Sequence, residues 1–321
     1  TATAPWRTIR HAIGATPAGG TVVVRAGTYR EQPGAIARRI TIQAYPHEQV
    51  WVSGAVVLNN FVRRGTTWVR SGWNPGFCRT CVHSTAVDPA HPAAGLPDQV
   101  VVDGTPLTEV VSATALGPGR FFVDPVAHEL VLGSDPTNHV VEATVHAGAL
   151  SVGPPSAAGT VIRGIGFTGF TSYEAGRPLA TISVSSPSVT LDHVAITNSG
   201  ARGVMISATG TTVQDSVVLA SGFSGIGAHR ADGLQLLRNR IGFSNAQRFA
   251  YLTSLSTSSI AGAKITASTN VVVRGNVFDD NSSNGLWIDI SCSDVAIVGN
   301  SSVRNADRKS TRLNSSHLVI S

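Results

Sequence analysis

The chain has few aromatic and few charged residues, and it contains no long apolar run. Of its 321 residues, 6% are aromatic and 13% are charged. No apolar segment approaches the roughly 18 residues that a membrane-spanning helix needs, so we expect no membrane span. Intrinsic disorder is excluded as well, because 42% of the residues are hydrophobic and can form a core. Length and composition therefore predict a folded chain of one or two domains.

Cysteine is also scarce, with 3 residues in the whole chain. Cys78 and Cys81 form a Cys-x-x-Cys pair, but a second pair for a four-cysteine zinc site and a βαβ pattern for a redox site are both missing. The spacing favours a local disulfide or two unreactive thiols. A zinc site that includes His83 and His91 is the weaker alternative. The odd residue, Cys292, is predicted to be a free thiol in a turn.

What the sequence does contain is a repeat, which runs from Val189 to Ala306. One polar anchor marks each unit, at steps of 23, 23, 37 and 24 residues: His193, Ser216, Asn239, Asn276 and Asn300. A second polar residue follows each anchor after five or six positions: Asn198, Ser221, Asn245, Asn281 and Asn305. The long step is one unit of 23 residues plus an insertion of 37 − 23 = 14 residues. A period of this size predicts stacked structural repeats.

Each repeat has the pattern of short β-strands joined by tight turns. Apolar residues alternate with others in triplets such as Val194-x-Ile196 and Val271-x-Val273, which buries one face of a strand. Gly, Asn, Asp and Ser between the triplets supply the turns. One coil cannot bury its inner face alone, so coils must stack about 4.8 Å apart. At that spacing an Asn amide in a column can donate to one neighbouring coil and accept from the other.

The sequence before the repeat is less regular. Residues 3–14 predict the only convincing helix, with Thr3 as its cap, Pro5 in its first turn and an apolar stripe that begins at Trp6. Such a helix would cover the exposed end of a solenoid. Between residues 50 and 146 the repeat is broken, and hairpin patterns predict a small antiparallel β insertion on the flank.

Three N-terminal segments and the coils after them resemble one superfamily. The segments are Pro5-Trp6-Arg7-Thr8-Ile9, Gly27-Thr28-Tyr29-Arg30-Glu31 and Ile40-Thr41-Ile42-Gln43-Ala44-Tyr45-Pro46. With the Asn- and Gly-rich coils, they resemble the pectate-lyase-like superfamily over most of residues 4–306. They are most similar to secreted bacterial right-handed β-helix repeat proteins. The resemblance implies an all-β, right-handed parallel β-helix of about 23 residues per coil. It implies no single activity, because the superfamily includes lyases, hydrolases, epimerases and adhesive parts.

We divide the chain into four segments on this basis. They are the cap helix and first coils (1–50), the insertion with its loop (51–146), the regular coils (147–306) and a tail (307–321). The tail breaks the repeat, and codons for Lys309 to His317 match a sequencing adapter. We therefore interpret it as non-native sequence that follows a natural chain truncated near Ala306. Without the tail's three Lys or Arg and one Asp, the net charge falls from +5 to 21 − 18 = +3, which requires no nucleic-acid partner.

Side-chain alternation in the last coils brings candidate functional residues to one sheet face. The residues that point outward there, or border the face, are Lys264, His229, Arg230, Trp287, Asp289, Arg202 and Tyr251. A base, an acid, cations and an aromatic platform in one groove would suit an acidic sugar chain. The alternative is a solvated surface on which Lys264 and Asp289 form an ordinary ion pair.

This set of residues predicts β-elimination on a uronic acid, the reaction of a polysaccharide lyase. Lys264 or His229 would remove the proton next to the carboxylate, and Arg202 or Arg230 would neutralise that carboxylate. No cofactor or metal site is evident. Calcium would have to bind through Asp289, a single acid where the ion prefers about six to eight oxygens.

Two other functions remain open at this point. One is a non-catalytic glycan-binding or structural surface solenoid. The other is a glycoside hydrolase, for which Asp279 and Asp280 are the obvious carboxylate pair, although a turn explains them better. For the protein as a whole we expect a polysaccharide partner that contains uronic acids, a monomer, and a secreted or cell-surface location, although this chain shows no signal peptide.

Overall fold

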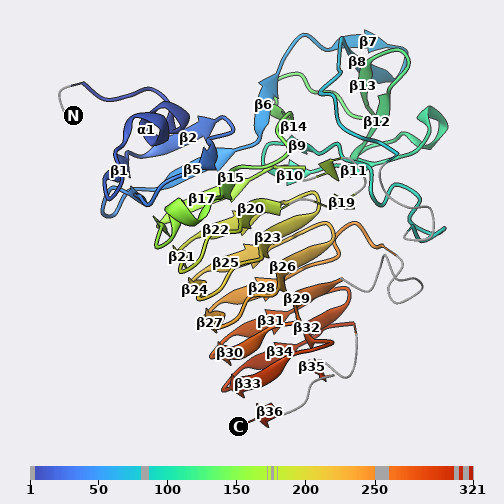
Figure 1. Cartoon of the computed structure of the whole chain (residues 1–321). Coiled ribbons are helices and arrows are strands. Elements are labelled where there is room, and N and C mark those ends of the chain that lie inside the picture. Colours follow the sequence, from blue (N-terminus) through green and yellow to red (C-terminus); the bar gives the residue numbers. More distant parts are fainter. Residues whose placement is uncertain are drawn as a thin grey trace.

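Three long parallel sheets dominate the molecule (Figure 1). The computed structural model describes residues 4–80, 87–171, 173–174, 177–178, 180–249, 260–306, 311–313 and 318–320. Sheet A contains β1 (Thr21–Val24), β4 (Thr41–Ala44), β16 (Val161–Arg163), β21 (Thr190–Asp192), β24 (Thr212–Gln214), β27 (Gln235–Leu237), β30 (Thr269–Arg274), β33 (Ser293–Val298) and β36 (Leu318–Ile320). Sheet B contains β2 (Gly27–Arg30), β5 (Val50–Ser53), β17 (Ile165–Thr168), β22 (Ala195–Thr197), β25 (Val217–Leu219), β28 (Arg240–Gly242), β31 (Val277–Asp279) and β34 (Ser301–Val303). Sheet C contains β3 (Gly34–Ile36), β15 (Leu150–Val152), β20 (Ala180–Val184), β23 (Arg202–Ile206), β26 (Ser224–His229), β29 (Ala261–Thr266), β32 (Asn284–Ile288) and β35 (Thr311–Leu313).

Each coil of the repeat adds one strand to each sheet, so equivalent side chains stack from coil to coil. In sheet C, Val204 pairs with Ile226, Ile226 with Ala263 and Ala263 with Leu286. Their relative exposure is at most 1%. These inward columns run into one continuous core. The predicted right-handed parallel β-helix, with its cap helix and antiparallel insertion, is confirmed.

The predicted Asn column is confirmed, with one correction. Asn276 Oδ1 accepts from the backbone N and the Nδ2 of Asn239, at 2.9 and 3.0 Å, and Asn300 Oδ1 does the same for Asn276. Ser216 continues this column, because its backbone N donates to Asn239 Oδ1 at 3.0 Å. His193 does not belong to it. His193 lies one residue earlier, in the turn between sheets A and B, with a φ of 51°.

The prediction of the second polar column was wrong by one residue at two of its members, Asn198 and Asn245. Asn281 Oδ1 accepts from the backbone N of Ser244, and Asn305 Oδ1 accepts from the backbone N of Asn281. The predicted member Asn245 instead donates its Nδ2 to Phe249 O at 3.2 Å. Asn198 has a φ of 52° and forms the turn between sheets B and C. Turn and ladder positions are neighbours that both favour small polar residues, so the sequence pattern alone did not separate them.

The capping helix is shorter than predicted. Helix α1 (Ile9–Ala15) begins after Thr8, whose Oγ1 accepts from the backbone N of His11 at 3.2 Å. The predicted cap, Thr3, lies outside the described residues. Trp6 precedes the helix and is 48% exposed, so the apolar stripe is formed by the buried residues Ile9, Ala12 and Ile13 alone. No helix in the described part of the chain is long and apolar enough to cross a membrane.

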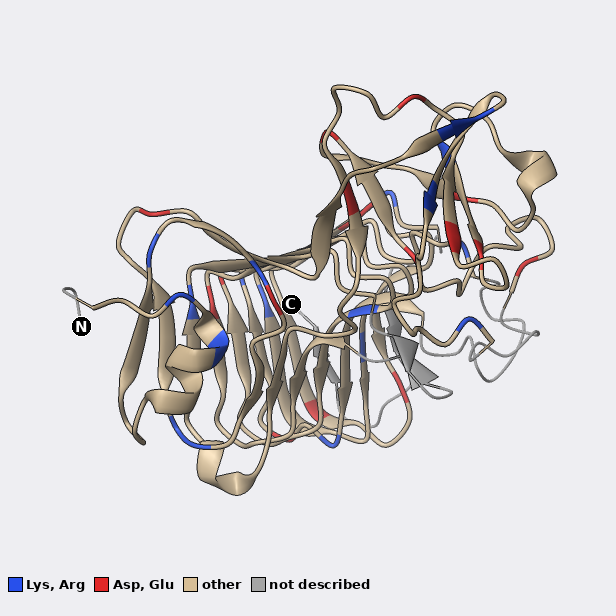
Figure 2. Ribbon diagram, turned by 90° about the horizontal axis from the view of Figure 1, so that it is seen from above, with Lys and Arg blue, Asp and Glu red and all other residues tan. Residues whose placement is uncertain are grey.

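The insertion consists of two small sheets that stand beside the coils (Figures 1 and 2). One contains β10 (Thr105–Pro106), β9 (Val100–Val102), β14 (Val141–Thr144) and β6 (Ala55–Leu58). The other contains β11 (Thr108–Glu109), β12 (Arg120–Asp124), β13 (Glu129–Leu132), β8 (Thr67–Ser71) and β7 (Val62–Arg64). All their pairings are antiparallel except that of β11 with β12. They share a core of their own around Phe121 and Leu130. The remaining short elements are η2 (Ala113–Ala115), η3 (Pro155–Ala157) and the β18 (Tyr173–Glu174) and β19 (Arg177–Pro178) pair.

The loop before β9 ties the insertion to the coils. Ala94 packs in a satellite cluster with Phe223, Phe249 and other residues of the solenoid turns. Gln247 accepts from the backbone N of Gly95 at 2.8 Å and donates to Leu96 O at 3.2 Å. The insertion is therefore held against the flank of the solenoid by this loop, and also by contacts such as the hydrogen bond from Thr144 Oγ1 to Gly169 O at 2.9 Å. In the same loop Cys78 is disulfide-bonded, while Cys81 lies outside the described residues. Cys292 is a buried free thiol.

The tail continues the coils where it is described. Strand β35 pairs in parallel with β32, and β36 pairs in parallel with β33. The expectation that the repeat breaks after Ala306 was therefore wrong for residues 311–313 and 318–320. An open strand edge accepts backbone hydrogen bonds from any extended segment, whatever its side chains. The adapter origin of the tail stays a prediction about the nucleotide sequence.

Candidate functional site

The predicted outward face of sheet C brings Lys264, Trp287 and Asp289 together. Lys264 pairs with Gly227 on one side and with Trp287 on the other, as the alternation predicts. Lys264 Nζ lies 2.7 Å from Asp289 Oδ2 and 3.6 Å from the centroid of the Trp287 ring. The contact is therefore an ion pair combined with a cation–π interaction.

This cluster is buried, which the sequence did not predict. Trp287 is 4% exposed and Lys264 is 7% exposed. The ring is not an open platform for a sugar, because one of its faces is occupied by the lysine ammonium. A lysine that serves as the cation of an ion pair also differs from the unprotonated amine that a base requires. The prediction of an exposed Trp287 was wrong, and the catalytic role of Lys264 stays a prediction.

The other predicted residues lie nearer the edges of sheet C. His229 is exposed, and its Nδ1 lies 2.9 Å from Thr266 Oγ1. Arg230 is exposed in a turn with a φ of 53°. Arg202 is half-buried, donates from Nε to Ser224 Oγ at 3.1 Å and lies 5.2 Å from the centroid of the Phe223 ring. Tyr251 lies outside the described residues.

The candidate hydrolase pair is explained by turn formation. Asp279 binds Arg240 at 2.7 Å, and Asp280 binds Arg304 at 2.7 Å. Asp280 has a φ of 54°, as a residue of the turn after sheet B. Each carboxylate is thus engaged by an arginine of a neighbouring coil, which agrees with the structural interpretation.

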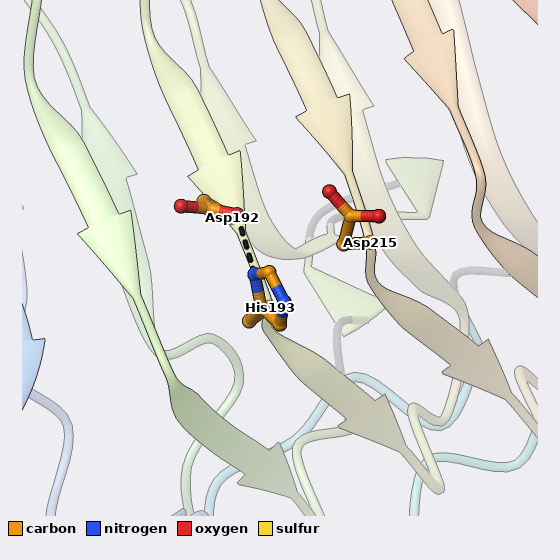
Figure 3. Close-up of side chains that lie close together, drawn as sticks. All are labelled: Asp192, His193 and Asp215. Carbon is orange, nitrogen blue, oxygen red and sulfur yellow. Dashed lines mark hydrogen bonds and ion pairs between the residues drawn. The ribbon is translucent and has the colours of Figure 1, made fainter. Parts of the chain in front are cut away.

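Asp192, His193 and Asp215 form the one metal-ligand-like group of three within the described residues (Figure 3). Their ligand atoms lie within 4.8 Å of one another. However, Arg163 Nε lies 2.7 Å from Asp192, and Arg238 binds Asp215 at 2.7 Å. Burial raises the pKa of Asp192, but hydrogen bonds from His193, Gln214 and Arg163 outweigh it and hold the pKa below its usual range. Cationic side chains already neutralise both carboxylates, so we interpret the group as an ion-pair ladder across coils.

A large cleft lies between the insertion and sheet B, and the sequence did not predict it. Its volume is about 1000 Å³. Trp51 of β5 lines it together with threonines from successive coils of sheet B: Thr28, Thr168 and Thr197. The insertion, the loop before β9 and residues 246–248 contribute the other walls. The cleft therefore exists only because the insertion packs beside the coils.

Trp51 lies against the neighbouring coil because a glycine makes room for it. Gly166 is its register partner in β17, and a Cβ at that position would meet the indole at 2.4 Å. The half-buried indole thus covers the sheet at Gly166 and contributes to the cleft wall. An aromatic side chain opposite a glycine in adjacent coils was a signal available in the sequence.

Two buried carboxyl groups share one arginine in the wall of the cleft. Asp98 and Glu109 both line the cleft, and their side chains are 2% and 7% exposed. Arg79 binds Asp98 through Nη1 and Glu109 Oε1 through Nη2, the latter at 2.8 Å. Asp98 also accepts from Trp73 Nε1 at 3.1 Å. Burial raises the pKa of Asp98, against the opposing effect of Arg79.

The pKa of Glu109 is raised much further. Burial and then the charge of Asp98 raise it to about 8, against the opposing effect of Arg79. This carboxyl group therefore keeps its proton at neutral pH, which few glutamates in proteins do. The sequence did not predict this cluster. No periodic pattern connects Arg79, Asp98 and Glu109, because they lie in irregular segments and short strands.

Positive charge is available at the cleft surface. Arg30 is paired with Glu142. Arg120 and Arg248 also line the cleft and are exposed, and neither forms an ion pair with a carboxylate of the described residues. Two guanidinium groups that no carboxylate of the described residues neutralises favour an anionic ligand in the cleft.

Comparisons with known proteins agree with the fold. The family described as "Right handed beta helix region" matches residues 180–320. The structure described as "The complex structure of XylC with xylose" is similar, with a TM-score of 0.76 and 16% identity over 94% of this chain and 59% of that chain. One described as "Glycoside hydrolase" has a TM-score of 0.52 and 11% identity over 97% of this chain and 93% of that chain. No curated protein matches the sequence. At these identities the likeness is one of fold, and this chain spans only 59% of the length of XylC.

Proposed function

We propose that this right-handed parallel β-helix protein binds an acidic polysaccharide in the cleft between its insertion and sheet B. The cleft itself carries the proposal, because its volume of about 1000 Å³ is at the upper end of ordinary ligand sites. Trp51 offers an apolar ring for a sugar, and the threonine hydroxyls can bond to sugar hydroxyls. Two proteins of the same fold, one solved with xylose and one named a glycoside hydrolase, support a carbohydrate ligand. Such a ligand would place the protein outside the cell or at its surface.

Arg120 and Arg248 in the cleft lining favour a negatively charged ligand. A guanidinium group binds a carboxylate through two parallel hydrogen bonds, which suits the uronic acids of alginate or pectate. Each charge-assisted hydrogen bond contributes roughly 1.5–3 kcal/mol before solvent screening. We therefore expect an Arg120→Ala, Arg248→Ala double variant to bind such a chain about 10- to 100-fold more weakly.

Isothermal titration with alginate, pectate and neutral xylan oligosaccharides measures this effect. Arg274→Ala is the matched control, because this arginine is exposed at the end of β30 and does not line the cleft. The affinity of the wild type should also fall with added salt, and that of the double variant should fall less. Equal affinity of the double variant and the wild type, or tighter binding of xylan than of the acidic chains, would contradict the proposal.

Cleavage by β-elimination on the face of sheet C is a second candidate. It depends on the Lys264–Asp289 pair beside Trp287, in which Lys264 would first have to transfer its proton to the carboxylate 2.7 Å away before it could act as a base. Under this candidate the wild type releases unsaturated, ultraviolet-absorbing products from pectate or alginate. Lys264→Ala should then slow their release by about 100-fold or more, whereas Arg274→Ala should not change it. Full activity of Lys264→Ala would remove this lysine from the reaction.

A further inference from the structure

The cleft wall contains a pair of buried carboxyl groups, Asp98 and Glu109, which the binding of a glycan does not require. Asp98, Glu109 and Arg79 together would carry one net negative charge if both acids were ionised. A buried net charge with little water around it is costly, so one proton on the carboxyl pair is favoured.

The hydrogen bonds assign the proton to Glu109. The Asp98 carboxylate accepts from both Arg79 and Trp73. Glu109 Oε1 accepts from Arg79, whereas no described residue bonds to Oε2. Glu109 also lines the cleft, so its second oxygen is the one left for a ligand.

We propose that Glu109 donates a proton to a glycosidic oxygen of the chain in the cleft, and that the protein hydrolyses this chain. The inference rests on the proposed function, because it needs a glycan in the cleft. The carboxyl group of Glu109 is protonated at neutral pH, since burial and the charge of Asp98 raise its pKa to about 8. A general acid with a pKa near the working pH is effective at such a step.

The reaction needs only water besides the glycan. The proton moves from Glu109 to the glycosidic oxygen, and the bond from that oxygen to the anomeric carbon breaks with its electron pair on the oxygen. Water then bonds to the anomeric carbon, and its proton returns to the Glu109 carboxylate. One hydroxyl group and one new reducing end result. Arg79 and Asp98 act as positioning residues, because they hold Glu109 without contacting the reacting atoms.

The test uses the acidic polysaccharide that binds best. We expect the wild type to release reducing ends without ultraviolet-absorbing unsaturation, and Glu109→Gln to do so at least 100-fold more slowly with an unchanged Kd. Glutamine keeps the Oε1 that accepts from Arg79 but has no acidic proton. Glu129→Gln is the control, because Glu129 lies in the same insertion, pairs with Arg64 and does not line the cleft.

The pH dependence gives a second measurement that needs no variant. The wild-type rate should fall as the pH rises through about 8, as Glu109 loses its proton. Besides Asp98 and Glu109, the charged or titratable groups that line the cleft are Arg30, His91, Arg120, Glu142 and Arg248. Rates are compared at saturating glycan, so that a change in binding with pH does not enter the comparison.

The outcomes separate the two proposals. Binding without release of reducing ends, a wild-type rate in Glu109→Gln, or unsaturated products would overturn the hydrolysis and leave the binding cleft standing. A rate that stays constant up to pH 10 would overturn it even if Glu109→Gln failed to fold. The absence of binding to any acidic polysaccharide would overturn both.

Discussion

Replacing Asn276 with alanine is expected to lower the free energy of unfolding by about 3–5 kcal/mol. Asn276 is 1% exposed, so water cannot replace its hydrogen bonds. Its Nδ2 donates to Leu236 O at 2.8 Å and to Asn300 Oδ1 at 2.9 Å. Its Oδ1 accepts from the backbone N and the Nδ2 of Asn239. Alanine would leave several of these buried groups unpaired, at roughly 1–3 kcal/mol each.

Urea unfolding followed by circular dichroism measures this loss. Asn59→Ala is the matched control, because Asn59 is exposed outside the ladder and should change stability by less than about 0.5 kcal/mol. Asn276→Ser should fall between the two. Ser216 already occupies this column, and its Oγ accepts from the backbone N of Val194 at 3.0 Å. A loss below 1 kcal/mol for Asn276→Ala would show that the ladder does not stabilise the coils as described.

The architecture was predictable because its causes are local and repeat along the chain. Alternation in each triplet decided which residues face inward, and stacking at a fixed spacing then decided which of them meet, as Val204 and Ile226 do. The Asn ladder was predictable because an Asn side-chain amide can donate a hydrogen bond to one neighbouring coil and accept one from the other. The errors were single-residue shifts, at His193 and Asn245, where a left-handed turn residue sits next to a ladder residue.

The functional surfaces were less predictable because burial and proximity depend on parts of the chain outside the repeat. Alternation placed Lys264 and Trp287 next to each other but said nothing about how much solvent reaches them. The cleft was missed because it arises when the insertion docks beside sheet B. Arg79, Asp98 and Glu109 meet only through that docking, and no period connects them.

The raised pKa of Glu109 predicts an unusual dependence of the free energy of unfolding on pH. A carboxyl group whose pKa is higher in the folded protein than in the unfolded chain stabilises the fold fully at low pH. That contribution is lost as the pH rises towards the folded value. For Glu109 the pKa rises from 4.5 to about 8, so the loss spreads over this interval. At 1.36 kcal/mol per pH unit, the upper limit of the loss is on the order of 5 kcal/mol.

Urea unfolding of the wild type and of Glu109→Gln at pH 5 and at pH 8.5 isolates this effect. Glutamine does not ionise, so Glu109→Gln should gain stability relative to the wild type as the pH rises. Titrating groups that do not interact with Glu109 act on both proteins alike and cancel in the difference. Glu129→Gln should not gain in this way, because Arg64 holds the pKa of Glu129 below its usual range. If the difference between Glu109→Gln and the wild type does not change with pH, then Glu109 is ionised in the folded protein at neutral pH. The cleft would then lack its proton donor, since an acid that has already lost its proton cannot protonate a leaving oxygen.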